Sequence, residues 1–464
     1  MLSFIRILLS SLIAYFLGRV IYCSFCNSSE KQSLIAKSHS FFIGLVFSSM
    51  CFWFYTIISN GQNTWYPIFE ISLIVIFYLN IRKKHIKSFG IFKFNYFPLV
   101  YKKDYLFFNL STIIIFSFIT ILCLINCSRY PDGAWDAVAM WNCKAIFLAC
   151  GNESWSGMFS DDLSYTHSDY PLFLSCIIAR TYIYVGKNNS IIPLLFSYLF
   201  CISCFILPFL YLNKLKNKYY ALFAVCLLSL SPNIINEGSK QYADIPLSVF
   251  FLISIYEIII WDYNTKKRLY KLPWLCILFS SSCFWIKNEG IPWFILYTLL
   301  LYYFKKFSFF SVKFFYGIIP SFLSRITIKI FTNTSIDFPV PLSSSLSNFF
   351  NLEYYNFIGI YICYYIKANI FIVLIPVFLL SGFIDKKYSK YKVILILITL
   401  MYFNYVLIYF FISDRLQLHL ANSFPRIATH FLPSLVFLGC LIYKNKQSKP
   451  IKADEITEKE KVLF

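Results

Sequence analysis

The sequence predicts an all-α protein that crosses a membrane many times, and three observations support this fold class. Hydrophobic residues make up 58% of the 464 residues and charged residues only 14%, whereas about a quarter of an ordinary soluble domain is charged. The apolar residues occur in runs close to the ~20 residues that span a bilayer as a helix. Lysine and arginine gather in short clusters between these runs, a pattern typical of cytoplasmic loops.

The charge and the cysteines exclude two other classes of protein. The net charge of +20 comes largely from the clusters between apolar runs, so it indicates membrane topology rather than a nucleic-acid-binding surface. The 15 cysteines are scattered, and neither CxxC spacing has a second pair or a histidine cluster beside it. We interpret them as small buried hydrophobic residues rather than as metal or redox sites.

The amino-terminal part of the chain alternates between apolar and basic segments. Its first run lacks the basic start and cleavage site of a secretory signal, so we expect it to be retained. A basic segment at residues 82–103 is expected on the cytoplasmic side. Residues 105–127 then cross to the outer side. The apolar runs before the basic segment are residues 2–23, 41–59 and 66–81.

Residues 129–171 form an outer loop that is acidic and rich in tryptophan. Asp136 is placed to cap a helix over residues 137–149. We expect this helix to lie along the membrane surface through four apolar side chains: Trp135, Met140, Trp141 and Ile146. Residues 170–185 are apolar too, but the positions of the lysines around them favour a juxtamembrane helix over a spanning one.

The remaining apolar runs alternate in direction and bring the prediction to about 13 membrane helices, with the amino end outside and the carboxy end inside. The dense lysine clusters then fall on one side and the acidic loop on the other. The domain prediction has three parts: amino-terminal helices and a basic loop at residues 1–104, a catalytic membrane domain at 105–443 with its outer loop at 128–189, and a cytoplasmic polar tail at 444–464.

The polar residues that could carry chemistry collect on the outer side in five segments. Segments that converge on one face of a membrane protein are typical of a site built between helices. The candidates are Asp136; His167 and Asp169; Tyr242 and Asp244; Lys287 and Glu289; and Arg426 and His430.

Each candidate also has a simpler explanation. Asp136 and Asp244 could be helix caps. Lys287 and Glu289 could form a solvated connection between two helices, although the neighbouring Gly290 and Pro292 favour a broken helix that lines a cavity. His167 could be an ordinary surface histidine. Arg426 could extend to the membrane interface without binding anything.

The motifs WDAVAMWNCKAIF, HSDYPLFL, YADIPL, KNEG and PRIATHFLP, in this order, resemble those of the polytopic GT-C glycosyltransferases. The resemblance is to the protein O-mannosyltransferase and lipid A aminoarabinose transferase group, and it covers roughly residues 110–443. It implies an enzyme that moves a hexosyl or pentosyl group from a polyprenyl-phosphate donor to a glycan, lipid or protein acceptor. It also implies a multi-pass protein of the bacterial inner membrane, with its site on the non-cytoplasmic face.

The same resemblance implies roles for individual residues. Asp136 matches the catalytic acid of the first outer loop, and Asp244 matches a second catalytic acid at the outer end of a later helix. Lys287 would face the lipid phosphate. Many relatives have two adjacent acids in the first loop, whereas Trp135 and Ala137 flank Asp136 here. The other candidates are expected to bind substrate: Glu289, His167, Asp169, Tyr242, Arg426 and His430.

These roles agree with the chemistry of sugar transfer. The reaction needs a base for the acceptor hydroxyl, which Asp136 could supply, and cations for the departing phosphate, which Lys287 and Arg426 could supply. No cofactor or metal ligand is assigned, although Asp136, Asp244 and Glu289 could collect a divalent ion. Two alternatives stay open: a transporter or flippase for a lipid-linked sugar, and an oligosaccharide polymerase or ligase.

Overall fold

The structure is a computed structural model, and in the part of the chain that it describes every regular element is a helix. Six of these helices are long and apolar enough to cross a membrane, and a bent pair, α8 and α9, would make a seventh. The expected class of a polytopic α-helical membrane protein is therefore confirmed. The described residues are 2–25, 33–83, 103–215, 218–265, 274–303, 312–332, 348, 350–368, 389–411 and 416–447.

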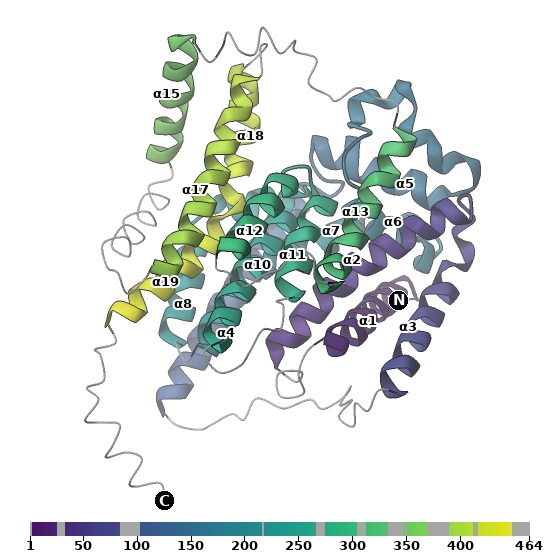
Figure 1. Ribbon diagram of the computed structural model, residues 1–464, viewed down its shortest axis with the longest axis horizontal. Helices are drawn as coiled ribbons and strands as arrows, with labels where there is room; N and C mark the ends of the chain where they lie inside the picture. Colours follow the sequence, from purple (N-terminus) through teal and green to yellow (C-terminus); the bar gives the residue numbers. More distant parts are fainter. Residues whose placement is uncertain are drawn as a thin grey trace, which may run out of the picture.

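Helices follow one another with short connections through most of the described chain (Figure 1). Their bounds, in order, are α1 Leu2–Phe25, α2 Leu34–Ile58, η1 Asn63–Trp65, α3 Tyr66–Lys83, α4 Lys103–Ser128, η2 Ala137–Asn142, α5 Cys143–Cys150, η3 Asn152–Phe159, η4 Asp161–Thr166, α6 Phe173–Val185, α7 Ile191–Lys214, α8 Lys218–Ser229, α9 Pro232–Ser239, α10 Asp244–Thr265, α11 Trp274–Ile286, α12 Gly290–Tyr303, α13 Val312–Phe331, α15 Leu352–Ala368, α17 Ser389–Phe410, α18 Leu416–His430 and α19 Leu432–Gln447.

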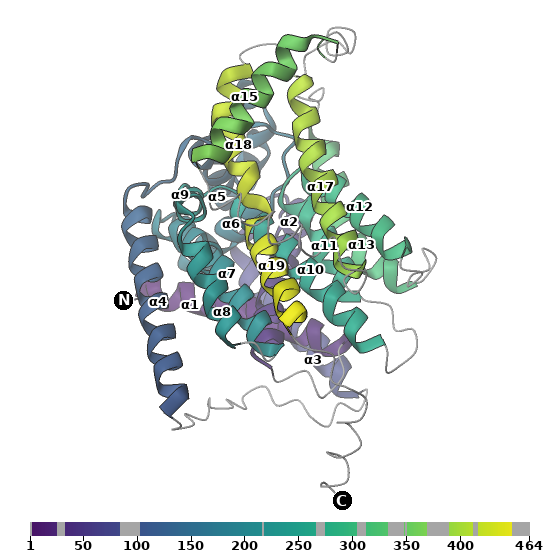
Figure 2. The same cartoon turned by 90° about the vertical axis from the view of Figure 1, so that its left-hand side faces the viewer.

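The figures show how the helices run between the upper and lower ends of the molecule. In Figures 1 and 2, α4 begins at the lower end and runs upward to the short helices of the predicted outer loop. Helix α18 lies in the upper part and α19 in the lower part. The basic segments that underlie the predicted topology, at residues 84–102, 266–273, 304–311 and 448–464, lie outside the described residues.

Helices α1 and α2 form the most closely packed pair at the amino end. Gly18 and Gly44 face each other across the contact, and a Cβ atom at Gly18 would lie 1.8 Å from the carbonyl oxygen of Ser40. A Cβ atom at Gly44 would lie 1.9 Å from the carbonyl oxygen of Ala14. Small residues that let backbones approach are typical of helix contacts in membranes, so larger side chains here would push the helices apart.

The predicted surface helix after Asp136 differs from the expectation in two ways. Asp136 is already helical, with φ −63° and ψ −32°, and its side chain makes no capping hydrogen bond. The cap prediction is therefore wrong, because the helix begins before Asp136. Trp135 is exposed, as expected for a surface helix, but Met140 and Trp141 are buried in the protein, so only one face of this segment is available to the membrane interface.

Helix α6 is held inside the protein by a buried ion pair. It has 13 residues, about 20 Å, which is short for a membrane span. The prediction placed this segment along the membrane, whereas nearly all of α6 is buried against its neighbours. Its Arg180 donates through Nε to both oxygens of Glu70 in α3 at 3.0 Å, and its Nη2 lies 2.8 Å from Glu70 Oε2. The same carboxylate accepts from Ser48 Oγ at 2.6 Å and Tyr184 OH at 2.7 Å.

Candidate active site

Asp244 is the centre of a buried network of charged groups. It is the first residue of α10, and its side chain is completely buried. Oδ1 accepts hydrogen bonds from Lys287 Nζ at 2.9 Å and from His430 Nε2 at 2.8 Å. Oδ2 accepts from Arg426 Nη2 at 2.8 Å. A buried carboxylate needs this kind of compensation to remain ionised.

Arg426 joins Asp244 to Asp136. Its Nε and Nη2 atoms lie 3.3 and 2.8 Å from Asp244 Oδ2, while Nη1 lies 2.6 Å from Asp136 Oδ2. The guanidinium also lies over the ring of Tyr242, 4.3 Å from its centroid, within the range of a cation–π contact. Burial and the charge of Asp136 raise the pKa of Tyr242 to about 12, so its hydroxyl stays protonated at neutral pH.

Lys287 lies in the tight turn between α11 and α12. Its ammonium group contacts Asp244 at 2.9 Å and Glu289 at 2.7 Å. Burial alone would lower the pKa of Lys287, but Asp244 and Glu289 outweigh it and hold the pKa above its ordinary value. The turn requires Gly290, because a Cβ atom there would lie 2.1 Å from the backbone of Cys283. Lys287 is therefore fixed inside the network rather than extended toward solvent.

His430 completes the network on its buried side. Its Nε2 faces Asp244, and its Nδ1 lies 3.0 Å from the hydroxyl of Tyr405 in α17. The imidazole thus has a partner on each ring nitrogen, which fixes its orientation. Both His430 and Tyr405 are buried, so they position Asp244 and are not exposed to a substrate from outside.

Hydrogen bonds connect the loop that carries Asp136 to the segment just before α10. Gln241, with a positive φ of 63°, donates through Nε2 to the carbonyls of Tyr130 and Pro131 at 3.0 and 3.1 Å. Its Oε1 accepts from Asn142 at 3.0 Å. These contacts hold the two acids of the site, Asp136 and Asp244, on adjoining segments although 108 positions separate them in the sequence.

The HSDYP segment reaches the network through α13. Arg325 donates to the backbone carbonyl of Asp169 and to the side chain of Asn288, the residue after Lys287. Lys329, one turn further along α13, lies 3.3 Å from Asp169 Oδ2. His167 is exposed, and its ring lies against Tyr170 at a centroid distance of 5.4 Å. His167 therefore lies at the rim, while Asp169 lies within a second set of ion pairs.

The structure brings together the five segments that contain the sequence candidates, and it adds residues that sequence reasoning missed. Arg325 and Lys329 were missed although they are spaced four apart in the apolar stretch SFLSRITIKIF, a spacing that places two side chains on one helix face. Tyr405 was missed because nothing separates it from the other 35 tyrosines of the chain.

The site offers acid–base groups and cations. The described residues include no group of three or more His, Cys, Asp or Glu side chains that could hold a metal ion. Both oxygens of Asp244 face cationic or imidazole nitrogens. This environment is better suited to binding an anion nearby than to coordinating a metal ion.

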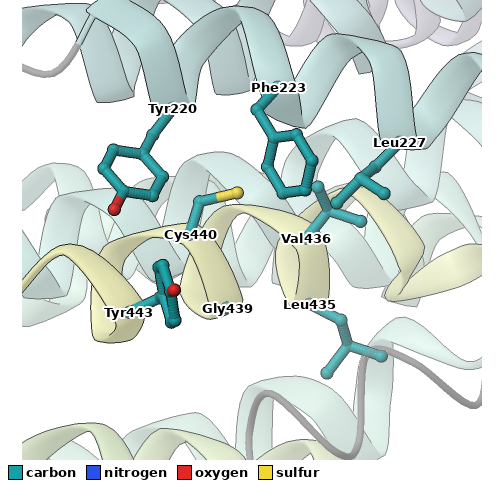
Figure 3. Close-up of a pocket in the computed structure, with 8 residues that line it drawn as sticks. All are labelled: Tyr220, Phe223, Leu227, Leu435, Val436, Gly439, Cys440 and Tyr443. Carbon is teal, nitrogen blue, oxygen red and sulfur yellow. The ribbon is translucent and has the colours of Figure 1, made fainter. Parts of the chain in front are cut away.

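A separate apolar pocket of about 160 Å³ lies between α8 and α19 (Figure 3). It is lined by Tyr220, Phe223, Leu227, Leu435, Val436, Gly439, Cys440 and Tyr443. No Asp, Glu, Lys, Arg or His is among these lining residues, so the pocket can accommodate a hydrocarbon group.

Comparison with known proteins adds no relative. No family model, no curated protein and no solved structure matches the chain.

Proposed function

We propose that this protein is a membrane glycosyltransferase that moves a sugar from a polyprenyl-phosphate donor to an acceptor hydroxyl on the non-cytoplasmic face. One observation carries the proposal. Asp136, a partly exposed acid from the first large loop, lies 2.6 Å from Arg426, which is itself held by the buried Asp244. In this proposal Asp136 is the general base and Arg426 the fixed cation, the two groups that phosphate-leaving sugar transfer requires.

The proposed reaction assigns a role to each group. Asp136 accepts the proton of the acceptor hydroxyl as the new bond to the anomeric carbon forms. The bond between that carbon and the phosphate oxygen breaks, and the phosphate leaves with the bonding electron pair. Arg426 stabilises the developing charge. Asp244, Lys287 and His430 hold Arg426 in place, so they are positioning residues in this scheme.

The finer topology is part of the proposal: about 13 spans, as the sequence predicts, in a bacterial inner membrane with the acidic loop outside. We expect a membrane-impermeant thiol reagent added to intact cells to label Ser156→Cys and Ser344→Cys but not Ser88→Cys. The background would lack accessible native cysteines such as the exposed Cys150. Labelling of Ser88→Cys and Ser344→Cys from the same side would contradict the topology.

A transfer assay tests the function itself. Purified protein in proteoliposomes would be supplied with radiolabelled polyprenyl-phosphate sugars and a membrane-lipid extract as a mixed acceptor. We expect one donor to be consumed, with its label recovered in a new product. Movement of intact donor across the bilayer without cleavage would instead support a flippase, and elongation of lipid-linked glycans would support a polymerase or ligase.

A further inference from the structure

The partners of Arg426 differ in a way that singles out one of them. Asp244 is completely buried and receives two nitrogens of the guanidinium, whereas the Asp136 side chain is 25% exposed and receives only Nη1. The ring of Tyr242 fixes the plane of the guanidinium. Arg426 is thus held in place from two sides without Asp136.

The segment that bears Asp136 also differs from the rigid helices around it. It continues into η2, a π-helical turn over Ala137–Asn142, and π-helical turns are frequent at functional sites. Gly133, three residues before Asp136, has a positive φ of 86°. Asp136 therefore lies between a tight turn and an irregular helical turn.

From this asymmetry we infer that the Asp136 carboxylate occupies the position of the donor phosphate in the resting protein, and that the phosphate displaces it from Arg426 Nη1. The inference rests on the proposed function and makes it more specific. A carboxylate and a phosphate oxygen are equivalent acceptors for a guanidinium N–H. The position 2.6 Å from Nη1 that Asp136 Oδ2 fills cannot hold a phosphate oxygen at the same time, so in this proposal phosphate binding there and the Asp136–Arg426 ion pair exclude each other.

The exchange orders the reaction. While Asp136 is paired with Arg426, its Oδ2 is engaged with Nη1 at 2.6 Å, so that oxygen is not available to an acceptor hydroxyl. Arrival of the phosphate releases the carboxylate beside the bound sugar, where it can accept the acceptor's proton. Donor binding therefore precedes activation of the acceptor, and an acceptor that enters first meets no free base.

Donor-site affinity tests the inference without requiring transfer. The probe is undecaprenyl phosphate, titrated against purified wild-type protein and variants in detergent micelles, with retention of radiolabelled probe as the readout. Asp136→Asn removes the competing charge, so we expect the dissociation constant to fall about tenfold, which corresponds to ~1.4 kcal/mol. Asp136→Ala should tighten binding similarly. Because alanine has no amide group, this variant shows that the tightening does not come from the amide of asparagine.

Two controls make the result specific. Asp132→Asn removes an exposed carboxylate from the same loop, and we expect unchanged affinity. Combining Asp136→Asn with Arg426→Lys keeps a cation beside Asp244 but removes the Nη1 edge, so the tightening should disappear. Unchanged or weaker binding by both Asp136 variants, with clear binding by the wild type, would overturn the exchange and leave the proposed function standing. Absence of saturable binding by every protein would overturn both.

Discussion

Replacing Asp136 with asparagine is expected to lower the rate of sugar transfer by ~10²-fold or more, the scale of a lost general base, while the protein still folds. Asparagine has the size of aspartate but does not accept the proton. The helix does not depend on this side chain, because Asp136 is already helical and makes no capping hydrogen bond. The measurement is single-turnover transfer with saturating donor.

Two comparisons separate a catalytic role from a structural one. Asp132→Asn, four residues earlier and exposed, should transfer at nearly the normal rate. The thermal midpoint of Asp136→Asn should stay within a few degrees of the wild type, because the asparagine oxygen can still accept from Nη1 and Arg426 keeps Asp244 as its counter-ion. Near-normal transfer by Asp136→Asn would remove Asp136 from the reaction and leave its ion pair with Arg426 as its only role.

Sequence patterns were sufficient for the class of fold and for the segments that meet at the site. Apolar runs indicate the membrane helices directly, because a helix must be long and apolar enough to cross the bilayer. Charged residues beside helix breaks, such as Asp244 and Lys287, stand out because burying them in a membrane protein is costly. The pattern also grouped Arg426 and His430 with them, and both contact Asp244 in the structure.

The pairing within the site could not be predicted in the same way. Nothing in the sequence states that Arg426 would bridge Asp136 and Asp244, or that Lys287 would be enclosed by two carboxylates, because these contacts depend on how distant helices pack. The cap interpretation of Asp136 failed for a related reason. A helix can begin one or two residues before the residue that would mark its start in the sequence. Here the side chain of Asp136 forms an ion pair with Arg426 instead of capping the helix.

Glu70 and Arg180 show the same limit more strongly, since neither was singled out by the sequence. Glu70 lies in an apolar run and Arg180 in the apolar segment after HSDYP. Only the packing of α6 between α1, α2 and α3 reveals that they meet. Their burial predicts a large effect on stability, far from the proposed chemistry.

Arg180→Met is expected to destabilise the protein by roughly 3–5 kcal/mol, the usual result of removing one partner from a buried ion pair. Glu70 would then be buried with hydrogen bonds from Ser48 and Tyr184 but no cation. Glu70→Gln should have a comparable cost, because it leaves the guanidinium of Arg180 buried without its counter-ion. Both effects are measured by heating the protein in detergent and determining by size-exclusion chromatography how much folded protein remains.

The double variant Glu70→Gln/Arg180→Met decides whether charge or packing causes the loss. If the uncompensated charge is the main cost, the double variant should be more stable than either single variant, since no buried charge remains and methionine fills much of the arginine's volume. The exposed Glu153 of η3 provides the matched control, and Glu153→Gln should change stability by about 0.5 kcal/mol or less. Additive losses in the double variant would mean that α6 is held by shape and by the Arg180 bond to the carbonyl of Ser10, and that the ion pair itself contributes little.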